Sequence, residues 1–125
     1  MLADATPNFF LGTAKPDEAK AFYADVIGLT FVRDDDYAVV FNCGAGELTF
    51  SKLKEVTPQF YTVLDFAVPS LETAHAELKA KGVAFERFGG MEFDAFDSWT
   101  TPDGAARIAW FKDPDGHMLS ISERR

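Results

Sequence analysis

The stretch Ala109-Trp110-Phe111-Lys112-Asp113-Pro114-Asp115-Gly116-His117-Met118-Leu119-Ser120-Ile121-Ser122 predicts two apolar strands joined by a tight turn. Pro114 presets φ for the turn, and Gly116 accepts the left-handed backbone that follows it. The stretch is therefore expected to form a hairpin in which the two strands lie side by side. Its polar residues raise the question of whether any of them takes part in chemistry.

Alternation along the second strand of this hairpin separates its side chains into two sets. Leu119 and Ile121 are expected on the face that a helix covers. Met118, Ser120 and Ser122 are expected on the opposite face, towards a cavity. Ser120 is thus the hairpin residue best placed for a role in binding.

The remainder of the second half predicts a strand, a helix and further strands. The predicted elements are a strand at 59–68, a helix that starts after the N-cap Ser70 and stops at Gly82, and strands at 83–88, 105–112 and 117–122. His75 lies on the apolar face of this helix, and His117 opens the last strand out of phase with Ser120. We expect both histidines to be structural.

The first half follows the same order. It predicts a strand at 8–12, a helix from Pro16 to the stop at Gly28, and strands at 29–33, 37–42 and 47–52. Both helices end in the same frame, Gly28-Leu29-Thr30-Phe31 and Gly82-Val83-Ala84-Phe85, which indicates an internal duplication. The sequence therefore predicts an α+β fold of two βαβββ modules.

Four motifs together resemble the vicinal oxygen chelate superfamily, which includes glyoxalase I, extradiol dioxygenases and the fosfomycin- and bleomycin-resistance proteins. The motifs are FYADVIGL (22–29), ELT (47–49), ELKAKGVAF (77–85) and AWFKDPDGHMLSIS (109–122). The resemblance implies one domain over 1–125, with module one at about 6–54 and module two at about 58–125. It also implies that the modules form paired half-barrels around a cleft, and that the chain forms a homodimer.

The same resemblance assigns the positions where relatives that use a metal carry its ligands. They fall here on Asn8, Glu47, Val63 and Ser120, with Asp65 as the nearest alternative to Val63. Zinc, iron or nickel needs three or four good N or O ligands, and a valine cannot donate at all. We therefore expect no metal and no other cofactor, and a divalent metal is disfavoured.

The segment 86–104 carries Met91, Phe93, Phe96 and Trp99 among glycines and acids. So much apolar surface on a loop predicts either a lid over a ligand or burial against the sheet or a dimer partner, and both alternatives remain open. The candidate ligand-binding residues are Asn8, Phe10, Glu47, Tyr61, Val63, Asp65, Phe93, Phe96, Trp99, Met118 and Ser120.

Composition excludes several classes of partner. The formal net charge of -8 disfavours nucleic acid and anionic membranes, and no apolar run is long enough to span a bilayer. The single Cys43 cannot form an internal disulfide, and residues 1–7 lack the pattern of a signal peptide. A cytoplasmic protein with a small-molecule partner is expected.

Two functions follow from these observations. The first is binding of a small organic molecule, aromatic or cationic, in the cleft without a metal. The alternative is a lyase, isomerase or dioxygenase of the same superfamily, in which Glu47 serves as a metal ligand or as the catalytic general base. The number of usable ligands favours binding.

Overall fold

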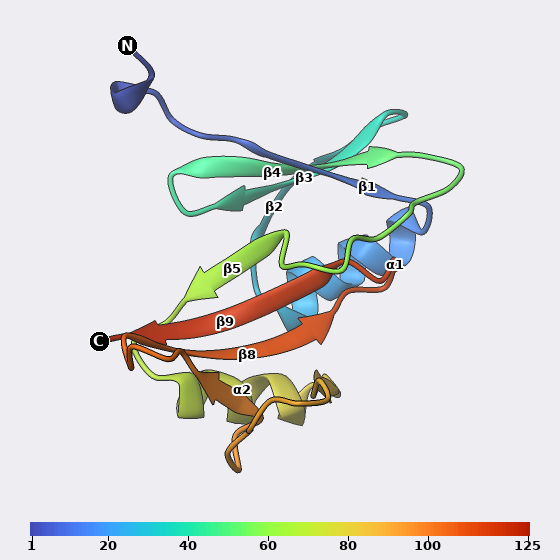
Figure 1. The fold of residues 1–125 in the computed structure, drawn as a ribbon. Helices are drawn as coiled ribbons and strands as arrows, with labels where there is room; N and C mark the ends of the chain where they lie inside the picture. Colours follow the sequence, from blue (N-terminus) through green and yellow to red (C-terminus); the bar gives the residue numbers. More distant parts are fainter. The chain divides into compact units, whose positions relative to one another are not determined.

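The computed structural model describes residues 1–125, which divide into two compact units, Met1–Thr57 and Pro58–Arg125. Each unit contains one sheet and one main helical segment (Figure 1). The fold is α+β with two βαβββ modules, as the sequence predicts. In both units the first strand of the module runs parallel to the last, β1 with β4 and β5 with β9, so the two sheets share one topology.

The first unit contains a four-stranded sheet of order β1-β4-β3-β2. Its elements are the 3₁₀ turn η1 (Leu2–Asp4), β1 (Phe9–Thr13), α1 (Pro16–Ala21), the π-helical η2 (Phe22–Val26), β2 (Thr30–Asp34), β3 (Ala38–Cys43) and β4 (Gly46–Lys52). Tyr23 is fully buried, and its ring lies 4.4 Å from that of Phe50 and 6.0 Å from that of Phe41. These aromatic contacts hold the helix on the sheet.

The helix of the first unit begins as predicted, with Pro16 in its first turn and two acids beside it. It ends at Gly28, whose φ of +85° is the left-handed conformation that a helix stop requires. The sequence pattern did not predict that the second half of this helix is π-helical. In that half the Ile27 N–H donates to the carbonyl oxygen of Phe22 at 3.0 Å. The helical face nevertheless buries Ala19 and Tyr23 as predicted.

The second unit contains a sheet of order β5-β9-β8-β6, and β7 also pairs with β8. Its elements are β5 (Leu64–Ala67), α2 (Leu71–Ala80), β6 (Phe85–Glu86), β7 (Ser98–Thr100), β8 (Ala106–Lys112) and β9 (Met118–Arg124). Helix α2 lies against one face of β8 and β9 (Figure 1). The Ser70 hydroxyl accepts a hydrogen bond from the N–H of Thr73 at 3.2 Å, so Ser70 is the N-cap that the sequence predicts.

Two predicted strands of the second unit are shorter than expected. The strand predicted at 59–68 begins only at Leu64, because its partner β9 starts at Met118. The hydrogen bond nearest the N-terminal end of β5 runs from the N–H of Val63 to the carbonyl oxygen of Met118. Phe60 and Tyr61 precede that bond, have no partner strand and are exposed. The strand predicted at 83–88 is reduced to Phe85–Glu86. Conversely, the predicted loop 86–104 contains the strand β7.

The hairpin of β8 and β9 forms as predicted. Gly116 has a φ of +88°, and its N–H donates to the carbonyl oxygen of Asp113 at 2.9 Å. The Asp113 carboxylate accepts from the backbone N–H groups of Asp115 and His117. The carboxylate therefore closes the turn, which gives Asp113 a structural role.

Candidate functional site

The two faces of the second sheet differ in chemistry. Phe111, Leu119 and Ile121 are buried on the face that α2 covers. The opposite face of β5, β9 and β8 carries Asp65, Ser120, Ser122 and Trp110, and we call it the Asp65 face. The alternation predicted for the last strand is confirmed, because the hydroxyls of Ser120 and Ser122 both reach Asp65.

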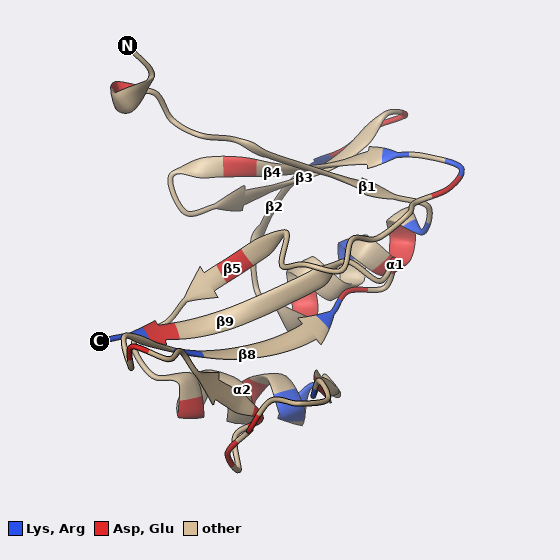
Figure 2. Cartoon of the chain, viewed as in Figure 1, with Lys and Arg blue, Asp and Glu red and all other residues tan.

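Asp65 is the only acidic residue of β5 (Figure 2), and side chains of the neighbouring strand β9 hold its carboxylate. The Ser120 hydroxyl donates to its Oδ1 at 2.6 Å, and the Ser122 hydroxyl donates to its Oδ2 at 2.7 Å. Arg124 Nη2 lies 3.6 Å from the same carboxylate. The side chain is 28% exposed, so this carboxylate is fixed in direction while its remaining lone pairs stay available.

Four aromatic residues surround the other end of the Asp65 face, and we call Phe88, Phe93, Trp99 and Trp110 the aromatic cluster. The Trp110 ring lies 5.5 Å from Phe88, 6.4 Å from Phe93 and 6.1 Å from Trp99. The indole N–H of Trp110 donates to the hydroxyl of Thr62 at 2.8 Å, which fixes the ring. None of the four rings is fully buried, so the cluster offers aromatic surface to a ligand.

Asp65, Ser120 and Trp110 stand in one row across three neighbouring strands, since Asp65 pairs with Ser120 and Ser120 pairs with Trp110. Two strand spacings separate the backbones of Asp65 and Trp110 by about 10 Å. A carboxylate and an indole thus lie within the length of one small organic molecule.

The other predicted residues of the second unit are distributed unevenly. Val63 and Met118 are bonded through their backbones at 2.9 Å beside the row of Asp65, and Met118 is buried. Tyr61 is exposed and precedes β5.

Phe96 does not join Phe93 and Trp99. Its ring packs against His75 of α2, with the ring centroids 5.8 Å apart, on the opposite side of the sheet from Asp65. The prediction that Phe96 shares a site with Trp99 therefore does not match its position.

The predicted residues of the first unit also lie near one another. The side-chain oxygen of Asn8 accepts a hydrogen bond from the N–H of Glu47 at 2.9 Å. Phe10 pairs with Thr49 and is 70% exposed. Glu47 and Thr49 alternate with the buried Leu48 on β4, so they point away from the core of this unit.

The four positions that the sequence resemblance assigns to metal ligands offer few free donor atoms for a transition metal. Asn8 has its side-chain oxygen engaged by the backbone, Val63 has no donor atom, and the Ser120 hydroxyl is bonded to Asp65. Neither unit contains a group of three or more His, Cys, Asp or Glu side chains placed to hold a metal ion. Among the four, only Glu47 offers a carboxylate, and the alternative Asp65 already accepts hydrogen bonds from Ser120 and Ser122.

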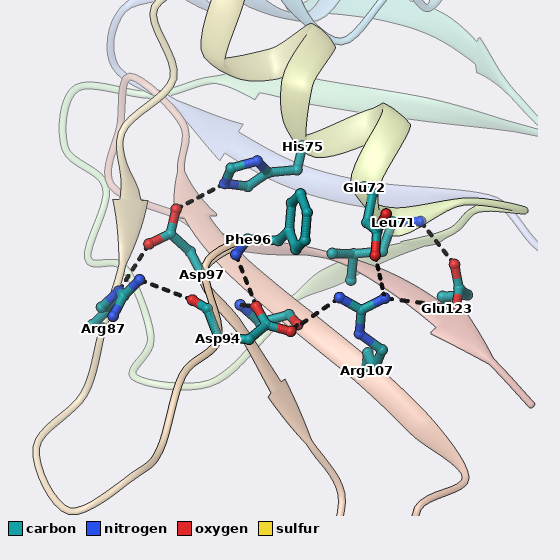
Figure 3. Close-up of polar contacts among 10 residues, drawn as sticks. Leu71, Glu72, His75, Arg87, Asp94, Phe96, Asp97, Arg107 and Glu123 are labelled. Atoms are coloured by element: carbon teal, nitrogen blue, oxygen red, sulfur yellow. Dashed lines mark hydrogen bonds and ion pairs between the residues drawn. The ribbon is translucent and has the colours of Figure 1, made fainter.

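A network of charged side chains, absent from the sequence predictions, lies on the α2 side of the second sheet (Figure 3). His75 Nε2 and Arg87 Nε each lie 2.8 Å from the Asp97 carboxylate. Arg107 Nη2 lies 3.0 Å from Asp94. The guanidinium of Arg107 also lies 3.6 Å from Glu72 and 3.9 Å from Glu123. The only signal in the sequence is the presence of acids among the aromatic residues of 86–104.

Both aspartates of this network have a lowered pKa. Partial burial raises the pKa of Asp94, but hydrogen bonds from the Ser98 hydroxyl and N–H and from Arg107 outweigh it and lower the pKa to about 2. Burial also raises the pKa of Asp97, but hydrogen bonds from His75 and Arg87 outweigh this effect, so the pKa is lowered. Both carboxylates are therefore ionised at neutral pH.

Comparison with known proteins places this geometry in a family. A model of the Glyoxalase/Bleomycin resistance protein/Dioxygenase superfamily matches residues 7–121. The chain therefore belongs to this superfamily, and the resemblance inferred from the sequence is confirmed. No curated protein sequence matches it significantly. Neither α1 nor α2 is long and apolar enough to cross a membrane.

Solved structures share the fold at low sequence identity. A lactoylglutathione lyase from Agrobacterium tumefaciens is 19% identical with a TM-score of 0.72, over 96% of this chain and 93% of its own. TnmS3, an antibiotic-binding protein from a Streptomyces species, is 17% identical with a TM-score of 0.71, over 98% of both chains. A glyoxalase/bleomycin resistance protein/dioxygenase from Nocardioides is 17% identical with a TM-score of 0.69, over 96% and 85%. These similarities define the fold.

Proposed function

We propose that the protein binds a small aromatic cation at the Asp65 face, without a protein-bound metal. The observation that carries this proposal is the row of Asp65, Ser120 and Trp110, in which a fixed carboxylate and an indole ring lie about two strand spacings apart. A carboxylate attracts a cation, and aromatic faces add cation–π attraction and stacking. The homodimer and the cytoplasmic location expected from the sequence stay predictions.

The physical properties of the whole chain support a cationic ligand. Its formal net charge is -8, which favours the approach of cations over anions. In Figure 2 the basic residues stand singly or in small groups among acidic ones. The antibiotic-binding protein TnmS3 supports the proposal by showing that binding is one role that this fold can serve.

A titration with 9-aminoacridine, a planar aromatic cation, tests the proposal. Both tryptophans of the chain belong to the aromatic cluster, so quenching of tryptophan fluorescence reports binding at this face. We expect saturable quenching and an affinity about 10-fold lower in Asp65→Asn, because the amide keeps the shape but loses the charge.

Asp36→Asn is the matched control, since it removes the same charge from an exposed turn of the first unit. It should bind as the unaltered protein does. The uncharged analogue anthracene should bind more weakly than 9-aminoacridine. Equal affinities in Asp65→Asn and Asp36→Asn would contradict the assignment of Asp65.

A further inference from the structure

The segment Arg87–Thr100 has two sides with different partners. One side supplies Phe88, Phe93 and Trp99 to the aromatic cluster. The other side holds Asp94 and Asp97 in the charged network with β8 and α2 (Figure 3). We propose that Asp94 and Asp97 are positioning residues, which set the rings of this segment against Trp110 and thereby determine ligand affinity; this inference rests on the proposed function.

Asp94 closes a turn and attaches it to β8. Its Oδ1 accepts from the N–H groups of Phe96 at 2.9 Å and Ser98 at 3.0 Å. Its Oδ2 accepts from the Ser98 hydroxyl at 2.6 Å and from Arg107 Nη2 at 3.0 Å. One carboxylate thus fixes both the shape of the turn 94–98 and its place on the sheet.

Asp97 is held in an unfavourable backbone conformation. Its φ of +56° is the only positive value among the non-glycine residues of the chain. Such strain persists only where surrounding contacts hold the residue. Here the contacts are Arg87 and His75, each 2.8 Å from the carboxylate, and the His75 ring is buried and stacked on Phe85 at 4.6 Å.

The fixed residues directly flank the aromatic ones. Phe93 immediately precedes Asp94, and Trp99 follows Asp97 by two residues. Trp99 then pairs with Ile108 of β8, the neighbour of Arg107. Because side chains alternate along β8, Arg107 holds the aspartate on one face while Trp110 meets the rings on the other. The rings are therefore positioned before a ligand arrives, which lowers the entropic cost of binding.

Two variants separate positioning from general stability. Asp94→Ala removes all four acceptor contacts of the turn, whereas Asp94→Asn keeps an oxygen for the two N–H groups. We expect a red-shifted tryptophan emission and a weaker near-ultraviolet circular dichroism in Asp94→Ala, with about 10-fold lower affinity for 9-aminoacridine. Asp94→Asn should show smaller changes of the same kind, and far-ultraviolet circular dichroism should stay unchanged in both.

Asp97→Gly provides a sharper test. Glycine adopts a positive φ freely, so the substitution relieves strain while it removes the contacts with His75 and Arg87. We expect the urea midpoint of Asp97→Gly to lie closer to that of the unaltered protein than the midpoint of Asp94→Ala does. The loss of aromatic signal and of affinity should be the same in both variants. Substitution of a residue with a merely structural role would change the aromatic signal only as far as it lowers the fraction of folded protein.

Glu72→Gln is the matched control, because Glu72 also pairs with Arg107 but lies on α2 outside the segment. It should match the unaltered protein in every measurement. Unchanged emission and near-ultraviolet signal in Asp94→Ala and Asp97→Gly would overturn the proposal, as would a changed signal with unchanged affinity. If the unaltered protein does not bind 9-aminoacridine, the proposed function fails, and the ligand-free signals alone then decide whether these aspartates position the rings.

Discussion

Gly44 and Gly46 occupy the same turn between β3 and β4 for different physical reasons. Gly44 has a φ of +60° and open space around it. Gly46 has an ordinary backbone, but a Cβ there would overlap the carbonyl oxygen of Pro7. Gly46 therefore permits the close approach that lets Asn8 bond the N–H of Glu47.

We predict that Gly46→Ala destabilises the first unit more than Gly44→Ala does. The first must displace backbone, at a cost of about 3 kcal/mol. The second only forces a left-handed alanine, at a cost of about 1 kcal/mol. Urea unfolding followed by circular dichroism measures both, and equal midpoints would disprove the close approach.

At the scale of the element, helix α2 depends on both of its ends and on the sheet beneath it. Ser70 caps its first turn, and the N–H of Leu71 donates to Glu123 of β9 at 3.0 Å. The helix stops at Gly82, whose φ is +90°. Capping is thus shared between a local side chain and a strand far along the chain.

Ser70→Ala should lower the free energy of unfolding by about 1 kcal/mol, because an N–H of the first turn loses its acceptor. Ser70→Asp keeps an acceptor oxygen and should retain most of the stability. Urea titrations of the three proteins measure the difference. A loss in Ser70→Asp equal to that in Ser70→Ala would show that the cap is not the cause.

The elements that local patterns govern could be predicted from the sequence, and those that depend on distant partners could not. The Ser70 cap, the Gly28 stop and the hairpin turn at Gly116 each depend on a few neighbouring residues. The shortened β5 depends on where β9 begins. In the candidate site, alternation predicted that Ser120 lies on the face opposite the helix, and the family resemblance supplied Asp65 as the alternative to Val63; the structure brings the two together. A loop has no period, so nothing predicted on which side Phe96 would lie.

At the scale of the whole molecule, the positions that the sequence resemblance assigns to metal ligands offer few free donor atoms in this chain. Val63 offers no donor, and the side chains of Asn8 and Ser120 are already bonded within the protein. A metal held by Glu47 alone would not offset the dehydration of the ion. The metal-free state remains part of the proposed function.

Elemental analysis of protein purified without chelator should find zinc, nickel, iron and manganese far below one equivalent per chain. Glu47→Ala should give the same values. Near-stoichiometric metal that disappears in Glu47→Ala would instead support the enzyme alternative, in which Glu47 is a ligand.

Because the first strand of each unit pairs with the last, the order of translation determines when each sheet can form. β1 gains its partner once β4 has emerged from the ribosome, so the first sheet can assemble while the second unit is still being translated. β5 must wait for β9, which stands between β5 and β8 and is the last strand to appear. Until then β5 has neither of its edges paired, and the carboxylate of Asp65 has no hydroxyls to hold it. The Asp65 face is thus completed later than the first sheet.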